Sequence, residues 1–397
     1  MIQILVNMID VEAAKLIVRE LSSIPKVIQI PLKRALGYVL SADILSPIYM
    51  PPFDQSAMDG YALKLAETLE YKLVGEVQAG SAENPSMKIG DAVRIFTGAA
   101  VPTDANAVIM QEKTKIEGTL LIVEEMPKLT ANIRPLGEQI KKGEIALKKG
   151  TELSPAAIGF LAGIGVSEVT VFQKPSVAVV VTGDELVSSG QVLERGQIYE
   201  SNGIMLANAL QKTGFDVPTI VRVKDDYAAT KNLLKAQLEK QDFVLISGGI
   251  SVGDYDFVGK ALLELGVEQL FYKVRQKPGK PMFLGKTTTS IVFALPGNPA
   301  AALSCYYQYV LTALKKAMGL PKFSLKKVYL PLAKTYLKKG NRAHFLKAKL
   351  THTGVEVLDG QSSAMLFSFA YADALIYIPQ DQMHTEAGTL VEVHLLP

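Results

Sequence analysis

The sequence predicts a multidomain protein of the α/β plus β class, built around a central doubly wound parallel α/β domain. Between Pro175 and Pro321, nearly unbroken apolar segments such as SVAVVV and FVLI alternate with segments of helical period. Such strands are typical of a parallel sheet that helices cover on both faces. On either side of this region, short strand-like segments are separated by Gly, Asn and Asp. This pattern predicts an inserted β domain and a C-terminal β-barrel-like domain.

The order of these segments indicates four domains. Asp10 can cap a short amphipathic helix, and the helix-like SPAAIGFLAGIG with the strand EVTVF returns later in the chain. We therefore expect an N-terminal discontinuous domain of residues 1–45 with 138–174, interrupted by an inserted β domain of residues 46–137. An α/β substrate-binding domain is expected over 175–322. The C-terminal β domain, residues 323–397, has a size typical of small barrels.

Composition excludes several classes of protein. The chain has 397 residues, 48% of them hydrophobic, which is enough for a large core. Lys and Arg number 42 against 39 Asp and Glu, with no block of like charges, which argues against nucleic-acid binding. Cys305 has no partner for an internal disulfide, so a reducing cytoplasm is expected. No apolar run approaches ~18 residues and no basic n-region begins the chain, so we expect no membrane span and no secretion signal.

Polar, glycine-rich loops follow three of the core strands of the expected α/β domain. Ligands bind beyond the carboxyl ends of the strands in open α/β sheets, and glycines let backbone N–H groups approach an anion. Each loop alone is weak evidence, but their coincidence at one sheet edge predicts a substrate site. Its expected members are Thr182, Gly183, Asp184, Ser247, Gly248, Gly249, Ser251, Pro296, Gly297 and Asn298.

Charged residues accompany these loops. Glu185 and Asp256 follow two different strands, and Asp225 and Asp226 follow a third. Beside an anionic substrate these carboxylates would repel one another, so we expect Mg²⁺ as a cofactor with all four as candidate ligands. Capping of the helix near Tyr227 is an equal alternative for one of Asp225 and Asp226. The loop Lys277-Pro278-Gly279-Lys280-Pro281 places two lysines on a stiffened turn that suits an oxyanion.

Other nucleotide and hydrolase signatures fit less well. Asp254 occupies the position that the lysine of a P-loop needs, and no Gly-x-Gly-x-x-Gly follows a strand. Gly249-Ile250-Ser251-Val252-Gly253 matches a nucleophile elbow, but Ser251 lies several residues beyond the strand end. A serine hydrolase would have to take its base from the C-terminal β domain, at His344 or His352. This hydrolase is the rival hypothesis.

Ordered motifs along nearly the whole chain resemble the molybdopterin molybdenumtransferases, the MoeA family, which includes the E domain of gephyrin. These motifs are Ser56–Ala62 (SAMDGYA), Ile95–Ala99 (IFTGA), Ile133-Arg134 through Gly137-Glu138, Thr182–Leu186 (TGDEL), Gln197–Asn202 (QIYESN), Ser247–Gly253, Lys277–Pro281 and Leu295–Pro299. The related molybdopterin adenylyltransferases share the Gly-Gly-x-Ser loop but have neither the flanking β domains nor the Met-Asp-Gly-Tyr motif.

This resemblance implies the final step of molybdenum cofactor biosynthesis. Molybdate, a substrate, is inserted into adenylated molybdopterin, and Mg²⁺-dependent hydrolysis releases AMP. The resemblance implies catalytic roles for Asp59, Thr97, Glu185 and Asp256, and molybdate binding by Lys277, Lys280, Arg342 and Ser363. It also implies a homodimer whose partner's β domain helps to line the active-site cleft. A docked molybdopterin adenylyltransferase is a further candidate partner.

The chain departs from the family at two positions. Gln139 follows Gly137-Glu138, where the family usually has Asp. Ala300-Ala301-Ala302 follows Pro299, where the family usually has a serine near molybdate, and Ser304 lies one turn further on. A scaffold role of the gephyrin kind is a third hypothesis, but the chain has no long linker and no fused adenylyltransferase module to support it.

Overall fold

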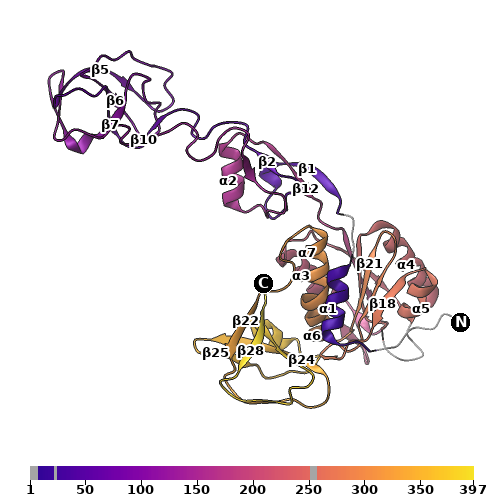
Figure 1. Ribbon diagram of the computed structural model, residues 1–397. Helices are drawn as coiled ribbons and strands as arrows, with labels where there is room; N and C mark the ends of the chain where they lie inside the picture. Colours follow the sequence, from indigo (N-terminus) through magenta and orange to yellow (C-terminus); the bar gives the residue numbers. More distant parts are fainter. Residues whose placement is uncertain (1–7, 22–24, 251–256) are drawn as a thin grey trace. The chain divides into compact units, whose positions relative to one another are not determined.

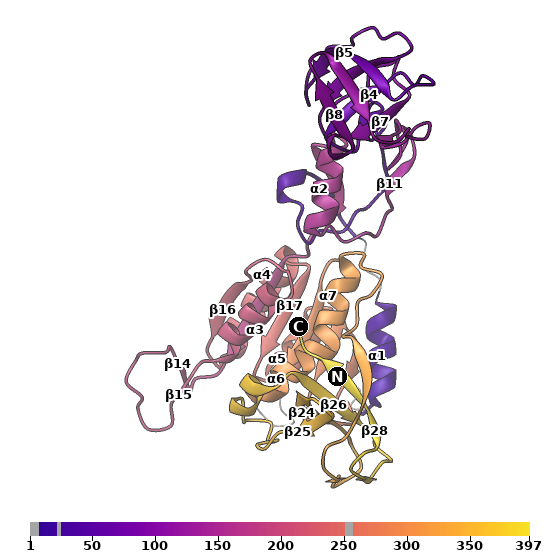
Figure 2. The same cartoon turned by 90° about the vertical axis from the view of Figure 1, so that its left-hand side faces the viewer.

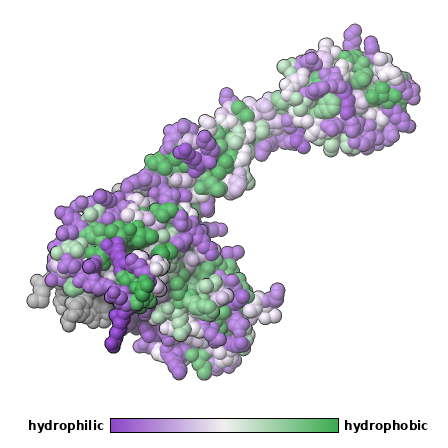
Figure 3. All heavy atoms as spheres, turned by 180° about the vertical axis from the view of Figure 1, so that it is seen from behind, coloured by the Kyte–Doolittle hydropathy of each residue, from purple (hydrophilic) through white to green (hydrophobic). Residues whose placement is uncertain are grey.

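The computed structural model describes residues 8–21, 25–250 and 257–397. The chain divides into two compact units, the first formed by residues 1–28 with 172–397 and the second by residues 29–171. Within the described parts of the chain, no helix has both the length and the apolar character needed to cross a membrane. On the face drawn in Figure 3, hydrophilic residues are spread over both units, with smaller hydrophobic groups between them.

A six-stranded sheet forms the centre of the first unit, in the order β16-β13-β17-β21-β20-β18. Four strands are parallel; β20 pairs antiparallel with β21, and β18 pairs antiparallel with β20, so β20 alone of the six strands runs against the others. The strands are β13 (Val177–Thr182), β16 (Thr219–Val223), β17 (Phe243–Ser247), β18 (Glu268–Tyr272), β20 (Phe283–Lys286) and β21 (Ile291–Leu295). The central strands β13, β17 and β21 are buried along their whole length, as their apolar sequences predict.

Helices cover both faces of this sheet (Figures 1 and 2). On one face the core includes α1 (Val11–Glu20), α3 (Asn202–Lys212), α6 (Pro299–Cys305) and α7 (Leu311–Ala317), the last two joined by a π-helical turn at Tyr306–Val310. The other face packs on α4 (Tyr227–Lys240) and α5 (Phe257–Glu264). A two-stranded ribbon of β14 (Leu186–Val187) and β15 (Ile198–Tyr199) extends from the end of β13. The predicted doubly wound α/β domain is confirmed.

The N-terminal helix lies elsewhere than its place in the sequence suggests. We expected it in a domain of residues 1–45 with 138–174, but α1 packs on α7 and residues 1–28 belong to the first unit. Val11, Ala14 and Val18 form the buried stripe that contacts the α/β core. An amphipathic stripe shows that a helix must pack on something, but it does not identify the partner.

The C-terminal domain is a second sheet of the first unit, ordered β19-β24-β26-β28-β22, with β25 paired to β24. Its strands are β19 (Gln276–Lys277), β22 (Lys327–Pro331), β24 (Ala343–Thr351), β25 (Gly354–Val357), β26 (Ala374–Ile378) and β28 (Leu390–Leu395). A small ribbon of β23 (Tyr336–Leu337) and β27 (His384–Thr385) and a 3₁₀ helix at Phe367–Tyr371 complete it. The sequence did not predict β19, a piece of the lysine loop that pairs in parallel with β24.

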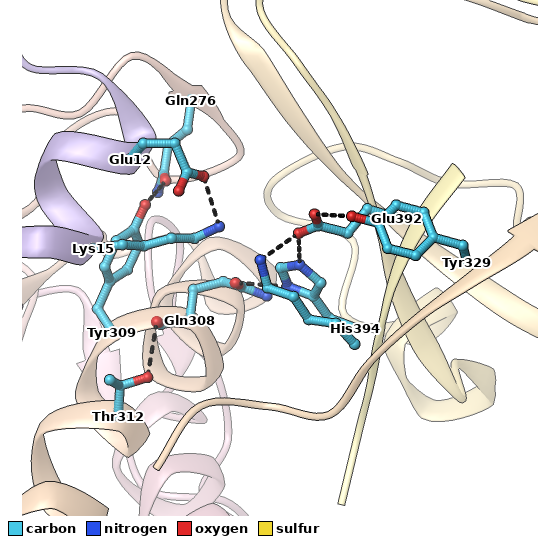
Figure 4. A network of polar contacts seen from close by, with 10 residues as sticks. Glu12, Lys15, Gln276, Gln308, Tyr309, Thr312, Tyr329, Glu392 and His394 are labelled. Atoms are coloured by element: carbon cyan, nitrogen blue, oxygen red, sulfur yellow. Dashed lines mark hydrogen bonds and ion pairs between the residues drawn. The ribbon is translucent and has the colours of Figure 1, made fainter. Parts of the chain in front are cut away.

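A network of polar contacts joins α1, the α6–α7 region and the C-terminal sheet (Figure 4). Lys15 pairs with Glu12, and its ammonium lies 4.6 Å from the centroid of the Tyr377 ring. His394 bonds Gln308 at 2.9 Å and Glu392 at 2.6 Å. The network therefore ties three separate stretches of the chain into one body.

The second unit contains a six-stranded sheet in the order β7-β4-β6-β5-β9-β8. Its strands are β4 (Gly60–Leu63), β5 (Glu70–Val77), β6 (Asp91–Ile95), β7 (Ala107–Met110), β8 (Thr114–Glu117) and β9 (Leu120–Val123), with a 3₁₀ turn at Gln111–Lys113. The strand-rich region predicted around residues 71–126 is this sheet. Three short ribbons, a 3₁₀ turn at Leu32–Arg34 and helix α2 (Pro155–Gly163) make up the rest. The ribbons pair β1 (Val27–Pro31) with β12 (Glu168–Phe172), β2 (Ile44–Leu45) with β11 (Ile145–Leu147), and β3 (Gln55–Ser56) with β10 (Ile133–Arg134).

Candidate active site

The loops after β13, β17 and β21 come together at the carboxyl edge of the α/β sheet. Gly248 has a φ of +95°, and a Cβ there would lie 2.7 Å from the Thr182 carbonyl oxygen. Gly249, at a φ of +63°, would place a Cβ 2.6 Å from the Val258 side chain. A Cβ at Gly297 would lie 3.8 Å from the Gly248 Cα. The distance at Gly297 is ordinary contact, but at Gly248 and Gly249 only glycine allows the backbone to pass so closely, so the Gly-Gly pair is required by the packing of the strand ends.

Asn202 connects two of these loops. From the first turn of α3, its Nδ2 donates to Ser247 Oγ at 2.8 Å and to the Gly297 carbonyl at 2.7 Å. Asn202 ends the QIYESN motif, yet the sequence reasoning did not place it in the site. Its position at the start of a helix, at the end of the polar Glu200-Ser201-Asn202 segment, was the signal available.

Buried polar atoms at this edge have no protein partner among the described residues. Thr182 Oγ1 and Asn202 Oδ1 form no hydrogen bond there, although both residues are at least nine-tenths buried. An unpaired buried polar atom costs ~1–3 kcal/mol, so such atoms are retained where a ligand or water satisfies them. Together with the glycine loops, they indicate a polar ligand at the carboxyl edge of the sheet.

Carboxylates gather beside these loops. Asp184 Oδ1 accepts from the backbone N–H of Asp225 at 3.2 Å. Partial burial, followed by the negative charges of Asp184 and Glu185, raises the pKa of Asp225. Asp226 caps α4, where its Oδ1 accepts from the N–H of Ala229 at 2.6 Å. The capping alternative therefore describes Asp226, and Asp225 remains in the acidic group.

This acidic group fits a divalent cation in its chemistry. The carboxylates of Asp184 and Glu185 repel that of Asp225, and a bound cation would relieve this repulsion. Oxygen ligands suit Mg²⁺. Within the described ranges, no three acidic, histidine or cysteine residues already form a metal-binding group. The remaining candidate ligand, Asp256, lies outside the described residues, as does Ser251. Mg²⁺ binding and the nucleophile-elbow hypothesis therefore both stay predictions.

Buried side chains hold the lysine loop, residues 277–281, in place. Gln276 Nε2 donates to the Gly279 carbonyl at 3.0 Å, and Tyr309 donates its hydroxyl to Gln276 Oε1 at 2.5 Å (Figure 4). A Cβ at Gly279, whose φ is +85°, would lie 2.4 Å from Cys305 Sγ. Lys277 and Lys280 are exposed on this framework. Two exposed cationic side chains are thus carried on a turn held by hydrogen bonds.

The C-terminal sheet brings Arg342 and Ser363 to the same part of the first unit. Ser363 Oγ accepts from Asn298 Nδ2 at 2.9 Å, and its carbonyl accepts from the N–H of Ala301 at 3.2 Å. Arg342 lies directly before the β24 residues that pair with Gln276 and Lys277. Ala301 is buried and meets the Ser363 loop through its backbone, while the neighbouring Ser304 is also buried and its hydroxyl has no described partner.

Asp59 and Thr97 form a pair in the second unit. Asp59 Oδ1 accepts from the Thr97 N–H at 2.7 Å and from its hydroxyl at 2.8 Å. These hydrogen bonds, the backbone one first, lower the pKa of Asp59. The next residue, Gly60, cannot carry a side chain, because a Cβ would lie 1.8 Å from the Ile109 carbonyl. The two residues thus lie together and present an ionised, exposed carboxylate, while their catalytic role stays a prediction.

The fold and the site define a class of protein. Its members combine an α/β ligand-binding domain, which has a lysine-containing loop suited to an oxyanion, with two β-rich regions. Three family models match in order: the MoeA N-terminal region (domain I and II) at residues 9–165, a probable molybdopterin binding domain at 178–316, and the MoeA C-terminal region (domain IV) at 329–396.

Individual relatives agree with these family models. A molybdopterin molybdenumtransferase of Haemophilus influenzae is 34% identical over 92% of this chain and 94% of its own. One from Staphylococcus aureus is 33% identical over 97% of this chain and 94% of its own. The crystal structure of a molybdopterin biosynthesis MoeA protein from Pyrococcus horikoshii superposes with a TM-score of 0.83 at 31% identity, covering 98% of this chain and all (100%) of that one. The chain belongs to the molybdopterin molybdenumtransferase (MoeA) family and is an enzyme of molybdenum cofactor biosynthesis.

Proposed function

We propose that this enzyme inserts molybdate into adenylated molybdopterin and hydrolyses the adenylate in a Mg²⁺-dependent reaction that releases AMP. The observation that carries the proposal is the hydrogen bond between Asn298 and Ser363. It joins the glycine-rich strand-end loops, which suit a phosphate-containing ligand, to the part of the C-terminal domain that carries the candidate oxyanion residues. A site for a nucleotide-like phosphate and a site for a small oxyanion therefore meet within one unit.

The chain's own residues can be assigned roles on this basis. Thr182, Ser247 and the N–H groups of Gly248 and Gly249 would hold the phosphates. Lys277, Lys280, Arg342 and Ser363 would bind molybdate by charge-assisted hydrogen bonds. Glu185, Asp225 and Asp256 would hold Mg²⁺, with the capping residue Asp226 as the weakest candidate. When bound, the ion would neutralise charge on the phosphoanhydride.

Asp59 has a different role in this proposal. Its pKa is lowered by Thr97, so it is ionised at neutral pH and accepts rather than donates a proton. Asp59 would orient a water molecule or the pterin side of the substrate, with Thr97 fixing the carboxylate rotamer. Cleavage adds water across the phosphoanhydride, so one P–O bond forms, one breaks, and AMP leaves with its phosphate.

AMP release from adenylated molybdopterin tests the function directly. The purified enzyme should release AMP only when molybdate and Mg²⁺ are both present. Glu185→Gln should still bind adenylated molybdopterin but release AMP at least ~100-fold more slowly, because the loss of a carboxylate ligand removes charge where it stabilises the transition state. Glu194→Gln, an exposed glutamate of the loop between β14 and β15, is the matched control and should behave as wild type.

Two results would contradict the proposal. Full AMP release in the presence of a strong chelator would remove the metal from the mechanism. Stoichiometric labelling of Ser251 by a fluorophosphonate, with loss of activity, would favour the serine hydrolase instead.

The proposal extends to assembly and location. The family resemblance supports a homodimer, with a molybdopterin adenylyltransferase as a candidate docking partner, and sedimentation velocity of each protein alone and of their mixture measures both. A cytoplasmic location is supported by the one thiol of the chain, because Cys305 is buried and burial raises its pKa to about 12. A thiol held in this protonated form is a poor nucleophile for disulfide exchange.

A further inference from the structure

Two lysines of the C-terminal domain are buried with their ammonium groups turned to backbone carbonyls. Lys347 is 2% exposed and Lys338 is 4% exposed. None of the ion pairs formed by the described residues includes either one. Burying a charge without an opposite charge is costly unless hydrogen bonds compensate for the lost water. Such an arrangement needs a reason other than stability.

Lys347 gathers the loop that carries Ser363. Its Nζ donates to the carbonyls of Gly360 at 2.6 Å, Met365 at 2.8 Å and Ser362 at 3.3 Å. These three carbonyls lie on both sides of Ser363 in the sequence. A single ammonium group on β24 therefore fixes the curvature of the whole loop.

Gln361 strengthens the same attachment. Its Oε1 accepts from the Lys347 N–H at 3.0 Å, and its Nε2 donates to the carbonyls of Lys347 at 2.8 Å and Leu358 at 2.7 Å. On its other side the loop meets the α/β domain, where Ser363 bonds Asn298 and Ala301. The loop is thus held between β24 and the strand-end loop after β21.

Lys338 does the same for the turn that carries Arg342. Its Nζ donates to the carbonyls of Gly340 at 2.9 Å and Arg342 at 3.1 Å, and to that of Gln380 at 2.9 Å. The turn leads into β24, whose first residues pair with the start of the lysine loop. Each of the two C-terminal residues expected to bind the oxyanion is therefore presented by a backbone segment fixed by its own buried lysine.

Positive charge accumulates here in the free protein. His344, the cross-strand partner of Lys277, is buried, and its Nδ1 bonds the Tyr336 hydroxyl at 2.9 Å. Desolvation first, then the charges of Lys277, Lys338 and Arg342, lowers the pKa of His344 to about 4. Asp381 places a negative charge near Lys338, and a bound oxyanion would supply further negative charge beside Lys277 and Arg342.

We propose that Lys347 and Lys338 are positioning residues for the oxyanion, Lys347 by fixing the loop that presents Ser363 and Lys338 by fixing the turn that presents Arg342. The inference rests on the proposed function, because it takes Ser363 and Arg342 as molybdate-binding residues. It adds two residues that cannot reach the oxyanion themselves and act through the carbonyl oxygens they hold.

Double-mutant cycles on molybdate-dependent AMP release test this inference. Lys347→Met should raise the half-saturating molybdate concentration about tenfold, the effect of losing one charge-assisted contact, with kcat less affected. In a Ser363→Ala background the same change should have less than about a twofold effect, since the loop then has nothing to present. Combined with Arg342→Ala, its full effect should remain. Lys338→Met should show the reverse pattern, coupled to Arg342 and independent of Ser363.

Lys15→Met is the matched control, because Lys15 is also buried against the C-terminal sheet but holds no loop of the site. It should leave the half-saturating molybdate concentration unchanged. If Lys347→Met does not fold, Gln361→Ala removes the second clamp of the same loop and should give the same coupling to Ser363.

The outcomes separate the inference from the proposed function. The proposed function would be overturned if the wild-type enzyme released AMP without molybdate. It would also be overturned if Ser363→Ala and Arg342→Ala left the half-saturating molybdate concentration unchanged. If those single variants behave as expected but the lysine effects simply add to both of them, the positioning inference is wrong and the lysines serve stability alone.

Discussion

The two ends of the Asn202 amide have different roles. The nitrogen holds the loops of the site in place, and the oxygen is left to bind a ligand. The Nδ2 of Asn202 is used up by Ser247 and Gly297, which leaves Oδ1 buried and unpaired among the described residues. The donor side of the amide connects two loops, and the unpaired acceptor side could accept a hydrogen bond from a ligand. Only an amide can satisfy both requirements at this position.

Asn202→Asp tests this double role. The carboxylate cannot donate to Ser247 and Gly297, so we expect the free energy of unfolding to fall by about 1–3 kcal/mol and the binding of adenylated molybdopterin to weaken at least tenfold. Asn208→Asp is the control, because Asn208 lies on the same helix and its side chain donates to the Ile204 carbonyl within that helix, not to the strand-end loops. Calorimetric titration measures the binding. Unchanged affinity in Asn202→Asp would show that the two loops need no connection.

At the scale of single elements, the lysine loop depends on one glycine. Gly279 combines a positive φ with a close approach to Cys305 and Gln276. Gly279→Ala should therefore displace the loop and raise the half-saturating molybdate concentration severalfold. Gly388→Ala, at a φ of +84° with nothing within 4 Å, introduces only the backbone strain of about 1–2 kcal/mol. Equal molybdate dependence in the two variants would mean that the loop accommodates the added methyl group.

The pair of Glu392 and His394 predicts how stability depends on pH. The hydrogen bond from His394, aided by Lys327, lowers the pKa of Glu392 to about 2. A carboxyl group with a lowered pKa stabilises the folded state above its unfolded pKa of ~4.3, and this contribution is lost as the pH falls toward 2. Glu392→Gln should cost about 1.5–3 kcal/mol at pH 7 and flatten the acid limb of the stability curve.

Urea unfolding between pH 3 and pH 7 measures this effect. Glu356→Gln is the control, because Glu356 pairs with an exposed lysine, Lys334, at the surface. Surface pairs contribute ~0–1 kcal/mol, so the control should change little. Parallel pH curves for wild type and Glu392→Gln would contradict the assignment.

The sequence predicted the elements of this protein better than their long-range partners. The buried strands β13, β17 and β21 and the loops after them follow from apolar runs and glycine positions, which are local signals. The pairing of Gln276 and Lys277 with β24 does not, because it joins residues far apart in the sequence, Gln276 with Ala343 and Lys277 with His344. Lys338 and Lys347 were missed for the same reason: a lysine that bonds carbonyls has no sequence signature.

At the scale of the whole molecule, the chain leaves the first unit and returns to it at neighbouring points. The N–H of Gln173 donates to the Lys26 carbonyl at 2.8 Å, so the two connections to residues 29–171 lie side by side. Lys26 pairs with Asp242 at 2.7 Å, and Asp242 also accepts from Ser176. Contacts within the first unit therefore hold together the two chain segments that lead to and from the second unit.

This arrangement predicts that the second unit can be removed. Replacing residues 29–171 with a short Gly-Ser linker between Ile28 and Phe172 should leave a folded protein, because domain insertions occur where the two connections are close. It should still bind adenylated molybdopterin, since the strand-end loops all lie in the first unit. It should release no AMP, because Asp59 and Thr97 are gone. Isothermal titration and the AMP assay measure the two properties separately. Retained AMP release would show that the Asp59–Thr97 pair has no part in catalysis, and loss of binding in a folded deletion variant would show that the second unit contributes to holding the substrate.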